Sequence, residues 1–420
     1  MFKTLANAWK LPDMRKKILY TLLMLLVFRV GAYIPVPGVN VDFIAQQVQN
    51  VDLLSLLDLM SGGALGNLTI FALGIMPYIN ASIIMNLLTV AIPALERMAK
   101  EGEDGRKKIA SITRYLGVVI GLIQAIGIIV GFGSEAVEDP SNFFNYVVVI
   151  GCLTAGTALI MWIGERITEN GIGNGISLLI FIGIVAKFPS EVFKIGNSLS
   201  LGGTNFWAIV LLIAAAFAIV VAIVFVDLGE RRIPVQYAKR VVGRKMYGGQ
   251  STHIPMKVNQ SGVMPLIFAI TIMTFPGMIA QFFPDSGFNE WTQKYFSQGS
   301  PGYIIIYALL ILFFTYFYSQ IAFNPVDVSK NIQQNGGFIP GIRPGKPTSD
   351  YLARILSRIT FFGAIFLALV AAVPSLVTGL TGTSTMFGAT SLLIMVSVAL
   401  ETTRQLESQL MMRHYKGFLG

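Results

Sequence analysis

Long apolar runs separated by short polar segments are the dominant pattern along this chain of 420 residues. A helix that crosses the hydrocarbon core of a bilayer needs about 20 mostly apolar residues. Such runs lie near residues 18–35, 70–93, 115–132, 146–163, 174–187, 206–226, 261–283, 302–323, 359–380 and 388–411. The pattern therefore predicts ten membrane-spanning helices, of which the fifth is short and opens with glycine.

The composition agrees with a membrane protein. Hydrophobic residues make up 54% of the chain and charged residues only 13%, whereas an average soluble domain carries about 25% charged residues. Most of the apolar surface must then face lipid. The single cysteine, Cys152, lies inside an apolar run, so one chain can form neither a disulfide framework nor a cysteine metal cluster.

The basic residues predict how the chain is oriented. Of the 31 Lys and Arg residues, only Lys187, Lys194 and Lys294 fall on one side of the predicted spans, and Arg29 lies within the first span. Cytoplasmic loops carry the excess of Lys and Arg, so both termini and all strongly basic loops are predicted to be cytoplasmic. The net charge of +9 is then explained first by topology, and RNA binding remains open only for the longer loops.

Two of the cytoplasmic loops, about 227–260 and 324–357, are longer than a connection between neighbouring helices requires. They contain turn-forming glycines and prolines such as Gly243, Gly337 and Pro340. Long loops with this content usually bind something. Anchoring of the topology explains part of their charge but not their length.

The segment 36–69, on the opposite side, contains three aspartates and no Lys or Arg, followed by the small-residue run from Ser61 to Asn67. Residues 53–73 are too apolar for a free loop, but their glycines make a poor spanning helix. A re-entrant element is tolerated only where protein or a water-filled cavity surrounds it, so this interpretation implies a cavity. A helix lying on the outer surface is the alternative.

Several functional classes lack their usual residues. The predicted spans contain almost no ionisable side chains of the kind that transporters use to bind ions or relay protons. Arg29 is the exception, and we interpret it as a packing or interfacial residue. No phosphate-binding loop, metal-ligand cluster or nucleophile with an adjacent base is evident, so the chain is predicted to be neither an enzyme nor a cofactor or metal carrier.

Helix interruptions beside isoleucines are the remaining feature of the spans. Pro77 lies between Ile75 and Ile79, which share one helix face, and Pro265 lies near Ile267. Isoleucines also follow small polar residues at 175–180 and 390–394. From spacing alone, such isoleucines are more typical of packing or lipid contact than of a functional role.

Ordered motifs along almost the whole chain resemble the SecY family, the central subunits of the bacterial protein-conducting channel. The motifs are Phe28–Gly31, Pro35–Gly38, Ser61–Ala64, Phe71–Ile79, Lys100–Glu103, Gly171–Ser177, Gln250–His253, Pro340–Gly345 and Gly388–Ile394. The resemblance implies an all-α polytopic fold of ten transmembrane helices in two pseudo-symmetric inverted halves, residues 1–205 and 206–420, around an hourglass pore.

The resemblance also assigns residues to the pore. A collar of apolar side chains that resists ions matches Ile75, Ile79, Ile176, Ile180, Ile267 and Ile394. A short re-entrant plug helix near 57–70 matches Ser61, Gly62, Gly63, Ala64, Leu65, Gly66, Asn67 and Leu68. A lateral gate between spans two and three and spans seven and eight matches Asn80 and Phe275. Unfolded polypeptides would cross the pore, and apolar segments would leave sideways into lipid.

The family resemblance finally implies partners and a location. SecE and SecG would be neighbouring membrane subunits in the bacterial cytoplasmic membrane, and the SecA motor ATPase or the ribosome would supply the energy to move secretory and membrane-protein precursors. A basic cluster suited to ribosomal RNA phosphates comprises Lys239, Arg240, Arg244 and Lys245, and Arg343 matches an arginine needed for motor function. A secondary transporter and a scaffold that only docks ribosomes are the competing hypotheses.

Overall fold

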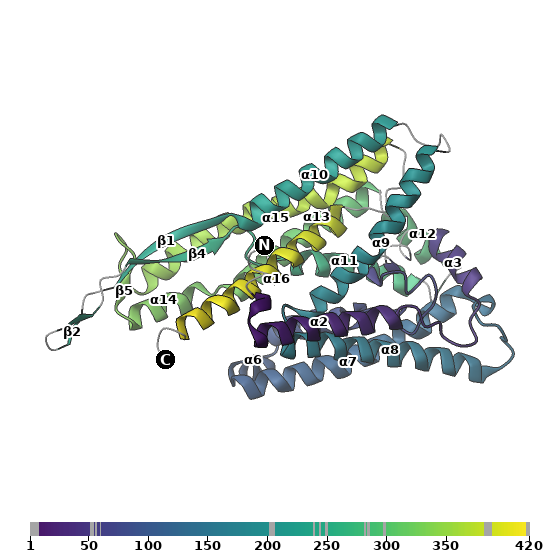
Figure 1. Cartoon of the computed structure of the whole chain (residues 1–420), viewed down its shortest axis with the longest axis horizontal. Helices are drawn as coiled ribbons and strands as arrows, with labels where there is room; N and C mark the ends of the chain where they lie inside the picture. The colour runs from purple at the N-terminus through teal and green to yellow at the C-terminus, as the bar shows by residue number, and fades with distance from the viewer. Residues whose placement is uncertain are drawn as a thin grey trace.

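The computed structural model describes residues 8–50, 54, 57–58, 60–200, 206–237, 240–242, 245–247, 251–280, 283, 286–296, 300–381 and 389–416. Long helices run side by side along its longest axis (Figure 1). A helix occupies each of the ten predicted span ranges. These are α2 (Pro12–Gly31), α5 (Met76–Ala91), α7 (Glu103–Phe132), α8 (Phe143–Asn170), α9 (Gly175–Ser200), α10 (Phe206–Leu228), α11 (Met264–Ala280), α13 (Pro301–Ala322), α15 (Lys346–Thr381) and α16 (Ala389–Lys416).

Length and hydropathy alone single out fewer spans than the sequence pattern does. In the described part of the chain, 4 helices are long and apolar enough to cross a membrane, or up to 5 with the bent pair α5 and α6 (Pro93–Lys100), whose axes differ by 99°. Shorter apolar helices lie at Gly175–Ser190, Ile213–Leu228 and Met264–Gly277. The ten-span prediction therefore depends on the succession of apolar runs and basic loops along the chain more than on the length and hydropathy of each helix.

The second predicted span begins later than expected. Its range was predicted to start at residue 70, but residues 70–75 form turns, and the helix starts at Met76. Two features explain the late start: Gly74 has a φ of +57°, and Pro77 occupies the first turn, where its missing N–H costs nothing. The proline therefore starts this helix instead of interrupting it.

Helices pack mainly against sequence neighbours. In the first part of the chain α5 contacts α7, α7 contacts α8 and α8 contacts α9, while α13 contacts both α11 and α15 in the second part. Contacts between the two parts join α11 to α5 and α7, and α16 to α9. Small residues allow close approach. At Gly156, for example, an added Cβ would lie 1.7 Å from the carbonyl oxygen of Ile70.

The two long loops that were predicted to be cytoplasmic fold together, and they contain strands that the sequence analysis did not predict. Strand β1 (Glu230–Tyr237) lies between β4 (Ser251–Lys257) and β5 (Gly337–Phe338) in an antiparallel sheet. Strands β2 (Arg240–Val242) and β3 (Lys245–Tyr247) form a separate hairpin. Helix α14 (Pro325–Gln334) contacts β5 and α15.

This cytoplasmic unit, defined as the sheet with α14 and the start of α15, has its own apolar core. The core contains Ile233, Val235, Met256, Ile332, Ile339, Leu352, Ile355 and Leu356. The unit lies at one end of the molecule, near the C-terminus, whereas α3 (Val41–Asn50) and α12 (Gly287–Phe296) lie at the other end (Figure 1). The alternating burial along β1 matches a strand with one buried face.

Candidate functional site

A polar cavity of about 500 Å³ opens among the ends of α9, α10, α11 and α16. Its lining is rich in charged and hydrogen-bonding side chains. It comprises Ser177, Asp227, Lys257, Asn259, Gln260, Ser261, Gly262, Val263, Met264, Ser397, Glu401, Arg404, Gln405, Ser408 and Gln409. The cavity lies at the helix ends that adjoin the cytoplasmic unit, because Asp227 precedes β1 and Lys257 ends β4.

Polar contacts shape the cavity wall. The Asn259 Nδ2 donates to Asp227 Oδ1 at 2.8 Å, and the Arg404 guanidinium donates to the backbone oxygen of Asp227. That carbonyl belongs to the last turn of α10, where a cation is favourable for the helix dipole. Burial lowers the pKa of the Lys257 ammonium, and the nearby Arg404 lowers it further. The charges of the wall are therefore held in place by neighbouring elements.

Other polar atoms of this wall have unused hydrogen-bonding capacity. Among the described residues, the buried Asn259 Oδ1, Ser261 Oγ and Ser397 Oγ have no hydrogen-bond partner. Buried polar atoms normally find a partner in protein or water. Water in the cavity would satisfy them.

Apolar side chains begin directly beside this cavity. Ile176 precedes the cavity residue Ser177 in α9, Ile267 lies one turn beyond Met264 in α11, and Ile394 lies one turn before Ser397 in α16. Of the six isoleucines predicted to form the collar, Ile75, Ile79, Ile180, Ile267 and Ile394 are buried, and Ile176 is half-buried. All six pack in one apolar cluster. The structure thus brings these six side chains into the same core, next to a polar space.

The predicted plug segment, Ser61–Leu68, also packs into the protein. Ala64, Leu65 and Leu68 are at most 1% exposed and share the apolar cluster of the isoleucines. This burial excludes the alternative of a helix lying on the outer surface for these residues. A plug helix was predicted near 57–70. Among the described residues of this range, Leu57, Asp58 and Met60 are helical, whereas residues 61–68 form turns.

Local backbone geometry explains why the helix does not continue. Gly62 and Gly63 have φ values of +72° and +92°, and Leu68 has a φ of +33°. Left-handed backbone ends a right-handed helix, and glycine adopts it without steric cost. The same glycines that predict a small, movable element therefore prevent it from being helical.

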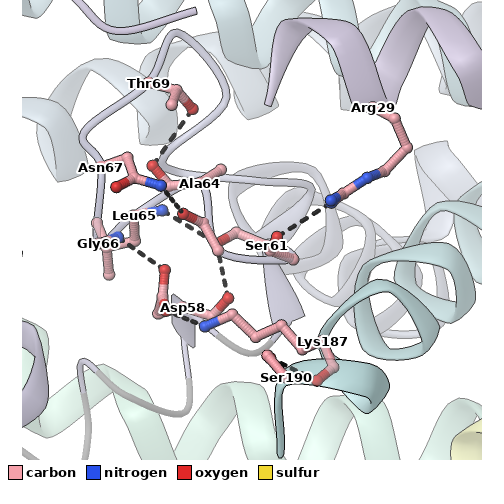
Figure 2. Close-up of polar contacts among 12 residues, drawn as sticks. Arg29, Asp58, Ser61, Ala64, Leu65, Gly66, Asn67, Thr69, Lys187 and Ser190 are labelled. Carbon is pink, nitrogen blue, oxygen red and sulfur yellow. Dashed lines mark hydrogen bonds and ion pairs between the residues drawn. The ribbon is translucent and has the colours of Figure 1, made fainter. Parts of the chain in front are cut away.

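Asp58 organises the turns of the plug segment. Its Oδ1 accepts a hydrogen bond of 2.7 Å from the amide of Gly66, and its backbone oxygen accepts from the amide of Gly63 at 2.8 Å and from Ser61 Oγ at 3.1 Å. The amide of Leu65 donates in turn to Ser61 Oγ at 3.3 Å. One partly buried carboxylate thus holds both ends of the turn (Figure 2).

Two basic residues hold the plug segment from neighbouring spans (Figure 2). Arg29 in α2 donates to the backbone oxygen of Gly62 at 3.0 Å, and Lys187 in α9 forms an ion pair with Asp58. Both members of that pair are largely buried, with side-chain exposures of 18% and 10%. Sequence reasoning assigned Arg29 only to packing and did not identify the Lys187–Asp58 pair. The signal available in the sequence for this pair was that Asp58 and Lys187 are both charged residues at the edges of apolar runs.

Close backbone contact adds a third constraint. A Cβ at Gly62 would lie 2.9 Å from the Cα of Gly183 in α9, and a Cβ at Gly183 would lie 2.7 Å from the backbone oxygen of Met60. Distances this short are not found for real side chains, so both positions need glycine. The segment is fitted closely against α9.

The predicted gate residues lie on α5 and α11, which contact each other. Asn80 is buried, and its Nδ2 has no hydrogen-bond partner among the described residues, whereas Phe275 is 41% exposed. A contact that the sequence did not reveal joins the same region: Asn86 Nδ2 in α5 donates to the Tyr318 hydroxyl in α13 at 3.1 Å. A single polar contact thus links the second and eighth spans.

The predicted partner-binding residues fall in the cytoplasmic unit and its hairpin. Arg240 and Lys245 lie in β2 and β3, while Lys239 and Arg244 lie outside the described residues. Arg343 is exposed, and its backbone oxygen accepts a 2.8 Å hydrogen bond from Thr348 Oγ1. Left-handed glycines flank it at Gly341 and Gly345. Arg343 is therefore an exposed residue of a turn with a glycine on each side.

Within the described residues, no group of three or more His, Cys, Asp or Glu side chains could hold a metal ion.

Comparisons with known proteins bear on the whole arrangement. Residues 69–403 match the SecY family model. A "Protein translocase subunit SecY" from Streptomyces galbus is 47% identical, with all of both chains covered. Among solved structures, "The structure of a protein conducting channel" has a TM-score of 0.69 at 19% identity and covers 94% of this chain and 92% of the other.

Two further structures match over the same shares of both chains. One, with a TM-score of 0.66 and 19% identity, describes a SecY protein whose plug domain "stablizes the closed state of the translocation channel and maintains a membrane seal". The other, Sec61 in a canine ribosome-channel complex, has a TM-score of 0.65 and 17% identity. At these identities the structural matches establish the fold.

Proposed function

The chain belongs to the SecY family, and on that premise we propose that its hourglass pore is closed by the six collar isoleucines and by the plug segment. The chain is the protein-conducting channel subunit of a Sec translocase, a membrane transporter and not an enzyme. Unfolded polypeptides pass the collar from the cytoplasmic side, while apolar segments leave through a gate formed by α5, α7, α11 and α13.

One observation supports this proposal more than any other. Along α9, the cavity residue Ser177 comes first, the collar residue Ile180 lies one turn later, and Gly183 and Lys187, which contact the plug segment, follow. A narrow apolar constriction beside a hydrated space excludes ions by dewetting. Isoleucine side chains make no directional bonds, so such a constriction imposes no requirement on the sequence of the polypeptide.

Ion conductance tests the collar. We expect the double variant Ile79→Asn and Ile267→Asn to increase ion leak across planar bilayers, because polar side chains keep the constriction wet. Ile84→Asn is the matched control, since Ile84 lies on the same helix as Ile79 but is 36% exposed. Unchanged conductance in a correctly folded double variant would contradict the collar assignment.

The cytoplasmic unit supports a proposal about partners. Exposed Arg343 and the hairpin that carries Arg240 and Lys245 would bind the SecA motor or ribosomal RNA phosphates, while SecE and SecG would be membrane neighbours. The structurally similar Sec61 is a ribosome-bound channel by its description. With the unit on the side of the basic loops, both termini lie in the bacterial cytoplasm, and residues 1–205 and 206–420 form the two halves that separate when the gate opens.

A further inference from the structure

Helix α12 is a short element at the end of the molecule opposite the cytoplasmic unit (Figure 1). It follows α11 and precedes α13, and it contacts both. Since α11 and α13 occupy predicted spans, their ends at this side lie near the membrane surface. The position of α12 along the membrane normal is thereby restricted to the interfacial region.

Helical spacing divides α12 into three faces. One face packs on the protein through Thr292, which is 3% exposed, and through Phe296, which contacts the main apolar cluster. A second face carries an aromatic stripe of Phe288, Trp291 and Tyr295, which are 39%, 48% and 41% exposed. The third face carries the polar residues Glu290, Gln293 and Lys294.

The aromatic stripe is an ordered surface. The rings of Phe288 and Trp291 stack with centroids 6.0 Å apart, and those of Trp291 and Tyr295 lie 5.8 Å apart. A different arrangement occurs in α3, at the same end of the molecule, where the apolar residues Ile44 and Val48 are 0% and 3% exposed. The apolar face of α3 is covered by the protein, whereas that of α12 is left outside.

The chemistry of the stripe fits the boundary between lipid headgroups and acyl chains. Trp and Tyr rings combine an apolar body with a polar edge and concentrate at membrane interfaces. An amphipathic helix lying in the interface buries its apolar face by about 5–10 Å and keeps its polar face in water. Glu290 and Lys294 balance each other in charge, so attraction to anionic lipids would add little.

We infer that α12 is an interfacial helix whose Phe288–Trp291–Tyr295 stripe lies in the headgroup region of the outer leaflet. This role is separate from the collar and the plug segment. It fixes the outer end of α11, the helix that carries Ile267 and Phe275, relative to the membrane surface.

Depth-dependent fluorescence quenching tests the inference. The chain contains 4 tryptophans, so the variant Trp9→Phe, Trp162→Phe, Trp207→Phe leaves Trp291 alone. In phosphatidylcholine vesicles, we expect lipids brominated near the headgroup to quench Trp291 more than lipids brominated near the bilayer centre. Aqueous iodide should quench it weakly. Strong quenching by iodide without quenching by lipid, or quenching by neither, would overturn the inference in favour of a solvated loop or a protein-covered surface.

A matched control uses the opposite face of the same helix. Adding Trp291→Phe and Gln293→Trp to the triple variant moves the fluorophore to the polar face, where we expect strong quenching by iodide. Adding Trp291→Phe and Phe288→Trp instead keeps it within the stripe and should restore the shallow lipid quenching. Equal quenching by lipid of the tryptophans on the two faces would also contradict the inference. So would lipid quenching of Trp291 that occurs only when the vesicles contain phosphatidylglycerol.

Discussion

The plug segment and the cytoplasmic unit both lie outside the straight spans, but different interactions hold them. The plug segment is fixed by one carboxylate, Asp58, together with Arg29 and Lys187 from two neighbouring spans. The cytoplasmic unit is held by paired strands and by a separate apolar core that includes Ile233 and Leu352. The polar contacts of the plug segment are few, whereas the cytoplasmic unit combines a strand ladder with a separate side-chain core.

That difference matches the roles proposed above for the two regions. A few hydrogen bonds and one ion pair can be exchanged for water one at a time, because each contributes only about 0.5–3 kcal/mol. A core of interlocking side chains resists partial opening, because every displaced residue leaves a cavity. The buried Leu65 and Leu68 still oppose release of the plug segment, so its departure exposes apolar surface that a passing polypeptide would have to cover.

The largest expected effect is on the cytoplasmic unit. Leu352 is fully buried in its core, and we expect Leu352→Ala to cost about 2–5 kcal/mol in the free energy of unfolding of this unit. Limited proteolysis of the loops and thermal unfolding would measure it. The neighbouring exposed residue provides the control: Arg354→Ala should change stability by less than about 0.5 kcal/mol. Equal effects of both variants would contradict the described core.

A smaller effect is expected from breaking the ion pair of the plug segment. Asp58→Asn and Lys187→Gln should each cost about 1–3 kcal/mol, because each leaves a largely buried group without its charged partner. The double variant should cost less than the sum of the two. Glu96→Gln, in the exposed pair with Lys100, is the control and should cost much less than either, because water screens an exposed ion pair. Thermal unfolding in detergent provides the four values, and strict additivity would argue against a direct pair.

A glycine pair separates backbone strain from close packing. Gly62 and Gly38 have similar φ values of +72° and +78°, but only Gly62 lies against another element, whereas nothing lies within 4 Å of a Cβ at Gly38. We expect about 1–2 kcal/mol of strain for alanine at either position, and an additional loss for Gly62→Ala from its contact with Gly183. Increased ion leak should accompany Gly62→Ala alone. Equal stability losses without leak would show that the contact with α9 is unimportant.

The smallest change in stability, with a large change in function, is expected at Arg343. Its side chain is exposed, so Arg343→Glu should alter the free energy of unfolding by less than about 0.5 kcal/mol. It should nevertheless block SecA-driven export into vesicles, because the reversed charge repels the partner surface. Lys346→Glu reverses the charge at another exposed position after the same turn. It tests whether any charge reversal in this region is enough to block export. Normal export by the Arg343 variant would count against the docking assignment.

The helices were largely predictable because their signal is local. Apolar runs of sufficient length gave all ten ranges, and Pro77 was recognised as a special position, although it starts α5 instead of interrupting a longer span. The strands of the cytoplasmic unit were missed, even though Ile233 and Val235 are two positions apart, as residues on one buried face of a strand are. The two-residue period of the strand is short, and it lies within a loop that is rich in basic and turn-forming residues.

The contacts of the site were not predictable in the same way. Asp58 and Lys187 are 129 positions apart, and Asn86 and Tyr318 are 232 apart, so no periodicity within one element relates them. The re-entrant segment was predicted from its apolar and glycine residues, and the same glycines keep its helical backbone from continuing past Met60. The collar isoleucines came from family resemblance, since their spacing alone is equally typical of packing.

The short pairing of β1 with β5 also has a mechanical meaning. Gln236 faces Phe338 and Tyr237 faces Gly337, so the chain leaving α10 is fastened to the chain that leads into α15. A force applied at the Arg343 turn would therefore act on both segments at once, the one that follows α10 and the one that precedes α15. If a partner docks at Arg343 as proposed, its movement of this turn would therefore act on α10 and α15 together.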